Sequence, residues 1–244
     1  MDDLATHGVA PRDLDRDATV VRLVADSADA YLAHLRPLYI GGHELHCPEA
    51  DAAAGHLDDG RRTILAGAAG AGKSVVAGQV VAIARHRQWP VRVVSADRLP
   101  DASTTTQLGV ELGLPDSPGT VLAAVAAGGD ALLVIDQLDA ISVTSGRHPE
   151  RLGLVNDLLR EVRSYPNLRV LLACRQFDID NDRALRAVAD EDNAAVVGIG
   201  TLNEQQIRAG LADAGLTAPV PARLMRLLAV PLHLVCTSSS PWLV

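Results

Sequence analysis

A chain of 244 residues, 48% apolar but only 2% aromatic, can form one α/β domain with a core of Ala, Val, Leu and Ile, whereas two full domains would be crowded. Its net charge of −8 gives no electrostatic basis for binding nucleic acid, which we do not expect among its partners. No run approaches the ~18 apolar residues of a membrane span, the start is acidic and the three cysteines are scattered, so we expect a cytoplasmic protein without membrane segments or disulfides.

Residues 1–45 are expected to form a leader that contains a helix. A charged stretch covers residues 12–17, and the apolar positions between Val20 and Leu35 partly fit helical spacing. Pro37 ends that pattern, and a second short helix is predicted over Glu49–Leu57.

From Thr63 onwards, short apolar runs alternate with helical stretches. The expected strands are Thr63–Ala66, Val91–Ser95, Ala131–Ile135, Leu168–Ala173 and Ala195–Ile199. The expected helices between them are Lys73–Arg87, Thr104–Leu112, Thr120–Ala127 and Gly153–Ser164. Five strands with helical crossovers predict an α/β fold over residues 46–200, with a doubly wound, mainly parallel five-stranded sheet.

The tail after Gly200 has a different pattern. Helices are expected over Asn203–Ala214 and Ala222–Leu228, with a third beginning in Leu232–Val235, and no sixth strand is evident. Residues 201–244 therefore predict the start of a small helical lid domain that breaks off, as in a fragment of a longer protein.

A phosphate-binding loop is predicted between the first strand and the helix that follows it. Its residues match G-x-x-x-x-G-K-[ST] and are Gly67, Ala68, Ala69, Gly70, Ala71, Gly72, Lys73 and Ser74. Glycines let backbone N–H groups face a phosphate at the positive end of a helix. Lys73, the sole lysine beside 21 arginines, is expected to bridge the phosphates, and Ser74 to bind Mg²⁺. A chance match to this motif is disfavoured because a predicted strand precedes the loop, a predicted helix follows it, and the only lysine of the chain occupies the lysine position of the motif.

Carboxylates after the third strand predict the metal and catalytic groups of a P-loop NTPase. Asp136 ends a buried strand and is expected to orient Mg²⁺. Asp139 is our candidate for orienting or deprotonating the attacking water, with a helix N-cap as the alternative role and Gln137 as a weaker catalytic candidate.

Arg175 ends the fourth strand and therefore reaches the same edge of the sheet. It is expected to contact the γ-phosphate, the alternative being a surface arginine paired with Asp178 or Asp180. Asp97 and Arg98, after the second strand, also reach this edge but are weaker candidates for a functional role. The cluster His43, His46 and Cys47 lacks a fourth ligand at convincing spacing for a metal site.

With these motifs, residues 45–236 resemble the signal-transduction ATPases with numerous domains, the STAND class that includes NACHT-type ATPases, especially its bacterial members. The resemblance rests on the phosphate loop, the block from Leu132 to Asp139, the strand ending in Arg175, and the Val230–Leu234 segment. The last is similar to the family's helical-domain proline motif, which implies that Pro231 contacts the adenine. The family often has a small residue in place of Gln137 and a second acidic residue in place of Ala140, so this chain has fewer of the family's residues for hydrolysis.

The expected function is a Mg²⁺-dependent ATP-binding switch that hydrolyses ATP slowly, in a signalling or defence protein. Two alternatives stay open, namely a nucleotide-binding module without turnover and a P-loop small-molecule kinase with Arg183 and Arg186 on a lid. ATP is favoured over GTP because the chain lacks an Asn-Lys-x-Asp motif. Expected partners are the nucleotide and either further copies of the chain or other domains of a longer protein.

Overall fold

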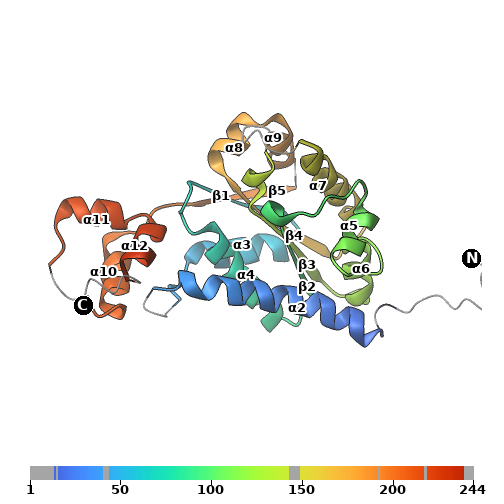
Figure 1. The fold of residues 1–244 in the computed structure, drawn as a ribbon, viewed down its shortest axis with the longest axis horizontal. Helices are drawn as coiled ribbons and strands as arrows, with labels where there is room; N and C mark the ends of the chain where they lie inside the picture. The colour runs from blue at the N-terminus through green and yellow to red at the C-terminus, as the bar shows by residue number, and fades with distance from the viewer. Residues whose placement is uncertain are drawn as a thin grey trace, which may run out of the picture.

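Five parallel strands form the centre of the molecule. The computed structural model describes residues 14, 16–40, 44–142, 149–191, 193–216 and 219–238. The strands are β1 (Arg62–Gly67), β2 (Val91–Ser95), β3 (Ala131–Asp136), β4 (Leu168–Arg175) and β5 (Ala194–Ile199). They lie in the order β2-β3-β4-β1-β5, and every neighbouring pair is parallel (Figure 1). The phosphate-loop strand β1 is thus separated from β3 by β4.

Helices cover both faces of this sheet (Figure 1). On one face lie α2 (Ala18–Leu35), α3 (Pro48–Asp58) and α4 (Lys73–His86). On the other lie α5 (Thr105–Glu111), α6 (Pro118–Val125), α7 (Pro149–Val162), α8 (Gln176–Asn181) and α9 (Arg183–Ala189). Helix α2 lies within the expected leader, yet its apolar stripe is buried in both cores.

Strand β3 shows why the sequence forms a covered sheet. All six of its residues are buried. Leu133 and Ile135 belong to the core on one face, and Leu132 and Val134 to the core on the other. A parallel strand buried on both faces is apolar along its whole length, since consecutive side chains point to opposite sides.

The α/β fold expected from the sequence is confirmed, with each strand ending within two residues of its expected limits. Two short helices, α8 and α9, were not expected. They follow β4 directly, and Asp182 between them caps α9 by accepting hydrogen bonds from the backbone N–H groups of Ala184 and Leu185. Helix α7 begins at Pro149 rather than at Gly153, because proline is tolerated in a first helical turn.

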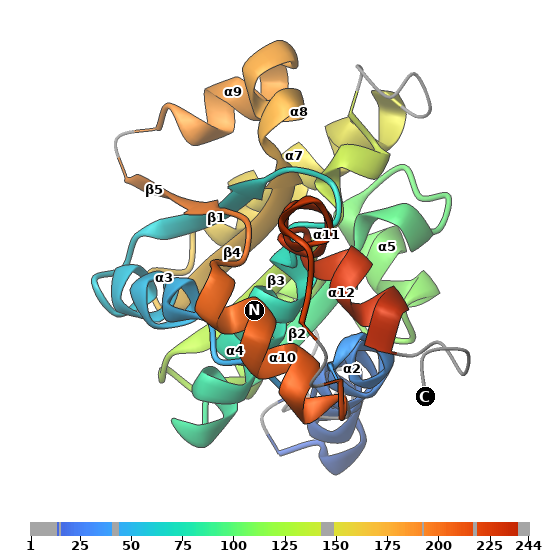
Figure 2. The same cartoon turned by 90° about the vertical axis from the view of Figure 1, so that its left-hand side faces the viewer.

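Three further helices, α10 (Glu204–Asp213), α11 (Ala222–Leu228) and α12 (Pro231–Ser238), lie beyond the carboxyl ends of the strands (Figures 1 and 2). Their apolar side chains meet in a small separate core with Ile40, which contains Ile207, Leu211, Leu228 and Leu234. No helix in the described part of the chain is long and apolar enough to span a bilayer.

Candidate functional site

The predicted phosphate loop connects β1 to α4 in the geometry that its motif requires. Gly70 and Gly72 have φ values of +73° and +94°, a left-handed backbone that glycine adopts without strain. Gly67 is needed for a different reason, because a Cβ there would lie 2.5 Å from the carbonyl oxygen of Ile199 in β5. The loop is therefore shaped by its own glycines and by the neighbouring edge strand.

Lys73, the first residue of α4, is turned back onto the loop. Its Nζ donates hydrogen bonds to the carbonyl oxygens of Gly67 and Ala68, at 3.2 and 3.0 Å. Burial lowers the pKa of Lys73, while the nearby Asp139 favours its charged form. The ammonium thus sits at the mouth of the loop, held by groups that a phosphate oxygen could replace.

Asp136 is fixed by a residue that sequence reasoning missed. The carboxylate is 2% exposed, and its Oδ2 accepts a 2.8 Å hydrogen bond from the Tyr31 hydroxyl of α2. That hydroxyl also lies 3.1 Å from the carbonyl oxygen of Ser74. Burial raises the pKa of Asp136, while hydrogen bonds from Tyr31 and Ser74 act in the opposite direction. The pKa of Tyr31 is raised well above its usual value by burial and by Asp136, so the hydroxyl remains a donor.

Asp139 and Arg175 form an ion pair, with 2.8 Å between Oδ2 and Nε. Asp139 lies in the middle of a short 3₁₀ turn, Leu138–Ala140, whose N-cap position is Gln137, so Asp139 is not at the cap itself. Asp178 accepts a hydrogen bond from Ser142 and Asp180 one from Gln176. Arg175 is thus bound to the candidate catalytic acid in this structure, and its contact with a phosphate stays a prediction.

Gln137 occupies a strained backbone position directly after the metal-binding candidate. Its φ of 60° and ψ of 38° are left-handed values that a non-glycine residue seldom adopts. The turn lets the N–H of Gln137 donate to Oδ1 of Asp136 at 2.8 Å. Both carboxylate oxygens of Asp136 are thereby oriented by hydrogen bonds.

These groups line one cavity of about 230 Å³ at the carboxyl edge of the sheet. Its lining residues include Gly70, Gly72, Lys73, Ser74, Asp136, Asp139, Arg175, Pro231 and Leu232. Because β4 lies between β1 and β3, Arg175 comes between the phosphate loop and Asp136. All three residues of the predicted catalytic set therefore meet the loop at one place.

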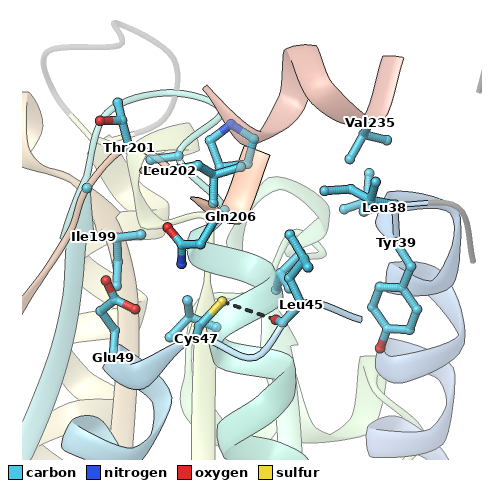
Figure 3. Close-up of a pocket in the computed structure, with 17 residues that line it drawn as sticks. Leu38, Tyr39, Leu45, Cys47, Glu49, Ile199, Thr201, Leu202, Gln206 and Val235 are labelled. Atoms are coloured by element: carbon cyan, nitrogen blue, oxygen red, sulfur yellow. Dashed lines mark hydrogen bonds between the residues drawn. The ribbon is translucent and has the colours of Figure 1, made fainter. Parts of the chain in front are cut away.

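A second, smaller cavity of about 70 Å³ adjoins the first and shares Gly72 and Pro231 with it. In Figure 3, Leu38, Leu45 and Val235 face Ile199 and Leu202 across it, with Gln206 between them. The lining is mainly apolar, as expected for a flat heterocycle.

Helix α12 is attached directly to the phosphate loop. The N–H of Leu232 donates a 3.2 Å hydrogen bond to the carbonyl oxygen of Gly70. A Cβ on Gly70 would lie 3.1 Å from that of Leu232, and one on Gly72 would touch Pro231 at 3.7 Å. Glycine at these positions lets the helix approach the loop.

The remaining candidates lie apart from this cavity. Asp97 and Arg98 form their own exposed pair, and His46 pairs with Asp51 at 3.1 Å, while His43 lies outside the described residues. No group of three His, Cys, Asp or Glu side chains suited to a metal ion occurs in the described ranges. All three cysteines are free: Cys174 is buried beside Arg175, Cys47 is half-buried and Cys236 on α12 is exposed. Burial raises the pKa of Cys47 to about 11 and that of Cys174 to about 12.

Comparison with protein families decides where this chain belongs. Residues 48–217 match the family described as Novel STAND NTPase 1. The matched range covers more than half of the chain and includes the loop, Asp136, Asp139 and Arg175. The chain is a member of this STAND NTPase family. The resemblance seen in its motifs is therefore confirmed. A search of curated proteins finds no match to the chain.

Solved structures share the fold of this STAND NTPase at low sequence identity. A Walker-type ATPase of Pyrococcus abyssi is 14% identical, with a TM-score of 0.56, over 82% of this chain and 68% of that one. AMPPCP-bound DnaA from Aquifex aeolicus is 17% identical, with a TM-score of 0.50, over 81% of this chain and 62% of that one. At these identities the likeness shows the fold alone.

Proposed function

We propose that this STAND NTPase is a Mg²⁺-dependent ATP-binding switch that hydrolyses ATP slowly. The observation that carries the proposal is the meeting of Lys73, Ser74, Asp136, Asp139 and Arg175 around one cavity. They combine a cation that can bind phosphate, oxygen ligands for a metal ion, a carboxylate and a second cation. These are the groups that phosphoryl transfer needs.

The loop and its neighbours fit a magnesium-bound triphosphate. Magnesium is usually held by one or two protein oxygens together with phosphates and water, and the oxygens of Ser74 and Asp136 suit that role. Tyr31 would keep the Asp136 carboxylate in place through its 2.8 Å hydrogen bond. Lys73 would exchange its two carbonyl partners for phosphate oxygens.

The ion pair between Asp139 and Arg175 is the reason to expect slow turnover. A carboxylate bound to a guanidinium is less free to orient or deprotonate water. When Arg175 turns towards a γ-phosphate, Asp139 is released to act on the attacking water. Hydrolysis would then depend on a rearrangement of this pair.

The smaller cavity supports adenine as the base. It lies between the loop and α12, and Pro231 lines it, as the family resemblance implied. The only lysine is used in the phosphate loop, so the Asn-Lys-x-Asp motif of many guanine-specific enzymes is missing. DnaA from Aquifex aeolicus, of similar fold, is bound to AMPPCP, an analogue of ATP.

Contacts between α12 and the loop support a switch. Bound nucleotide would set the position of α10–α12 relative to the sheet, since Pro231 and Leu232 line the nucleotide cavity. As a STAND NTPase, the chain would act in a signalling or defence protein, with other domains or further copies of itself as partners.

Titration calorimetry with a non-hydrolysable ATP analogue and Mg²⁺ tests the binding site. Lys73→Ala should weaken binding at least tenfold, about 1.4 kcal/mol. Lys73→Arg keeps the charge but should also bind poorly, because a guanidinium is broad and planar where the loop holds a compact ammonium. Wild-type affinity in Lys73→Ala would refute the proposed site.

Formation of ADP and release of inorganic phosphate, each measured with and without small-molecule acceptors, separate the alternatives. A hydrolase forms ADP and inorganic phosphate without an acceptor. A kinase forms ADP and a phosphorylated acceptor, without free phosphate, only when the acceptor is present, and a binding module forms ADP in neither case. No structural observation favours the kinase, since Arg183 and Arg186, in the described helix α9, are not among the residues that line either cavity.

A further inference from the structure

A second polar cavity lies at the opposite edge of the sheet, where β1, β4 and β5 begin. Its volume is about 300 Å³. Its lining includes Gly60, Arg61, Arg62, Arg163, Arg169 and Asn193. Four of these residues are arginines, and no carboxylate lines the cavity in the part of the chain that the structure describes. In a chain with a net charge of −8, this local excess of arginine requires an explanation.

The arginines outnumber the acids that hold them. Glu191 pairs with both Arg62 and Arg163. Asp130 pairs with Arg169 at 2.8 Å. The fourth guanidinium, of Arg61, donates to the carbonyl oxygen of Ala194 at 2.7 Å. Among the described residues, four guanidinium groups thus meet two carboxylates, which leaves a local excess of positive charge at this cavity.

Two of these side chains also have buried donors without an acceptor. The Nε groups of Arg62 and Arg169 are buried and have no hydrogen-bond partner among the described residues. The Arg62 side chain is only 10% exposed, so water reaches it poorly. Leaving such donors unpaired costs free energy, which an anion in the cavity would recover.

The guanidinium groups are held in place by the surrounding backbone. Gly60 has a φ of +73°, and a Cβ there would lie 3.1 Å from Nη1 of Arg169, so glycine lets the turn close over this arginine. Asn193 donates from its side chain to the carbonyl oxygen of Gly60 at 3.0 Å and ties the turn to the start of β5. Burial lowers the pKa of Arg62, Glu191 acts in the opposite direction, and the nearby Arg163 adds a smaller lowering effect.

We infer that this cavity binds a small phosphate-type dianion, either inorganic phosphate or the phosphate group of a small ester. Guanidinium groups match phosphate oxygens with two parallel hydrogen bonds, and four arginines line this cavity of about 300 Å³. The inference does not depend on the proposed nucleotide switch, because the cavity is at the other end of β1.

Titration calorimetry on the full chain tests this site, with inorganic phosphate and ribose 5-phosphate as ligands. Lys73→Ala removes the cation with which the phosphate loop would bind phosphate, so any phosphate binding that remains in this variant occurs at another site. Arg163→Gln, in which a half-exposed side chain is changed, should weaken that binding at least fivefold, and so should Arg61→Gln. The matched control is Arg160→Gln on the same helix, whose side chain pairs locally with Asp157 and should keep full affinity.

Tighter binding of ribose 5-phosphate than of phosphate would identify the ester as the ligand, and equal binding would identify the free ion. Equal affinity in Arg163→Gln, Arg61→Gln and the unchanged chain would overturn the inference. Loss of all binding in Lys73→Ala would overturn it as well. So would binding of poly-glutamate without binding of either phosphate, since the arginines would then serve an acidic protein partner.

Discussion

The nucleotide cavity has two unlike halves. Its sheet side is built from buried strands, and Asp136 there is 2% exposed and oriented at both oxygens. Its helical side leaves large apolar residues in solvent, with Leu224, Leu227 and Leu232 exposed by 41%, 53% and 47%. The leucine-rich composition is common to both halves, so hydrophobicity does not distinguish them.

The difference lies in the size of the hydrophobic core that each half contains. The sheet has a large core on each face, while α10–α12 share only a small cluster with Ile40. Direct attachment of α12 to the loop includes one backbone hydrogen bond, from Leu232 to Gly70. We therefore expect the chemistry in the half that is held firmly and movement in the half that is held weakly.

The largest effect should come from the acids of the sheet side. Asp139→Asn should lower ATP turnover about a hundredfold and spare binding, because general acid–base groups typically contribute that much. Asp136→Asn should chiefly harm Mg²⁺-dependent binding. Calorimetry and phosphate release on both variants measure the two effects separately. Unchanged hydrolysis in Asp139→Asn would show that this carboxylate does not act on the attacking water.

A smaller effect is expected from Tyr31→Phe, which removes one hydroxyl behind the metal site. The Mg²⁺ concentration for half-maximal nucleotide binding should rise about tenfold, as is typical when a residue that orients a metal ligand is lost. Tyr165→Phe is the matched control, since its hydroxyl faces Thr120 at 3.1 Å on the other face of the sheet. Equal Mg²⁺ requirements in the two variants would show that Tyr31 serves packing alone.

The smallest effect should come from Leu232→Ala on the helical side. Its side chain packs on Gly70, so the variant should weaken ATP binding about twofold, less than 1 kcal/mol. Leu224→Ala on α11 makes the same change away from the loop. Hydrogen exchange should show α10–α12 exchanging ahead of the five strands, faster still in Leu232→Ala, and more slowly with ATP and Mg²⁺. Uniformly slow exchange that ignores nucleotide would contradict a movable half.

The sequence predicted most of the sheet side because its features are local. Consecutive residues are enough to identify an apolar strand such as Ala131–Asp136 and the phosphate loop that ends in Lys73-Ser74. Helices α8 and α9 were missed because α8 consists mostly of polar residues and α9 follows it after Asp182 alone, so no long apolar helical period appears between β4 and β5. Asp182, which caps α9, was the one residue in the sequence that indicated the start of a helix there.

Contacts between distant segments could not be predicted in the same way. The pairing of Asp139 with Arg175 depends on β4 lying next to β3, and the sequence pattern does not determine strand order. Tyr31 lies on the buried stripe of α2 in a chain with only three tyrosines. A tyrosine buried in such a stripe needs a partner for its hydroxyl, but which partner follows only from the packing of α2.

The three cysteines make this chain convenient for labelling. Cys174 and Cys47 have raised pKa values, about 12 and about 11, so little of either is thiolate at neutral pH. Cys236 is exposed and lies on α12, the helix whose first turn contacts the phosphate loop. A maleimide dye added to the unmodified sequence is therefore directed to the helical half, where its fluorescence can report movement of α12 without any mutation.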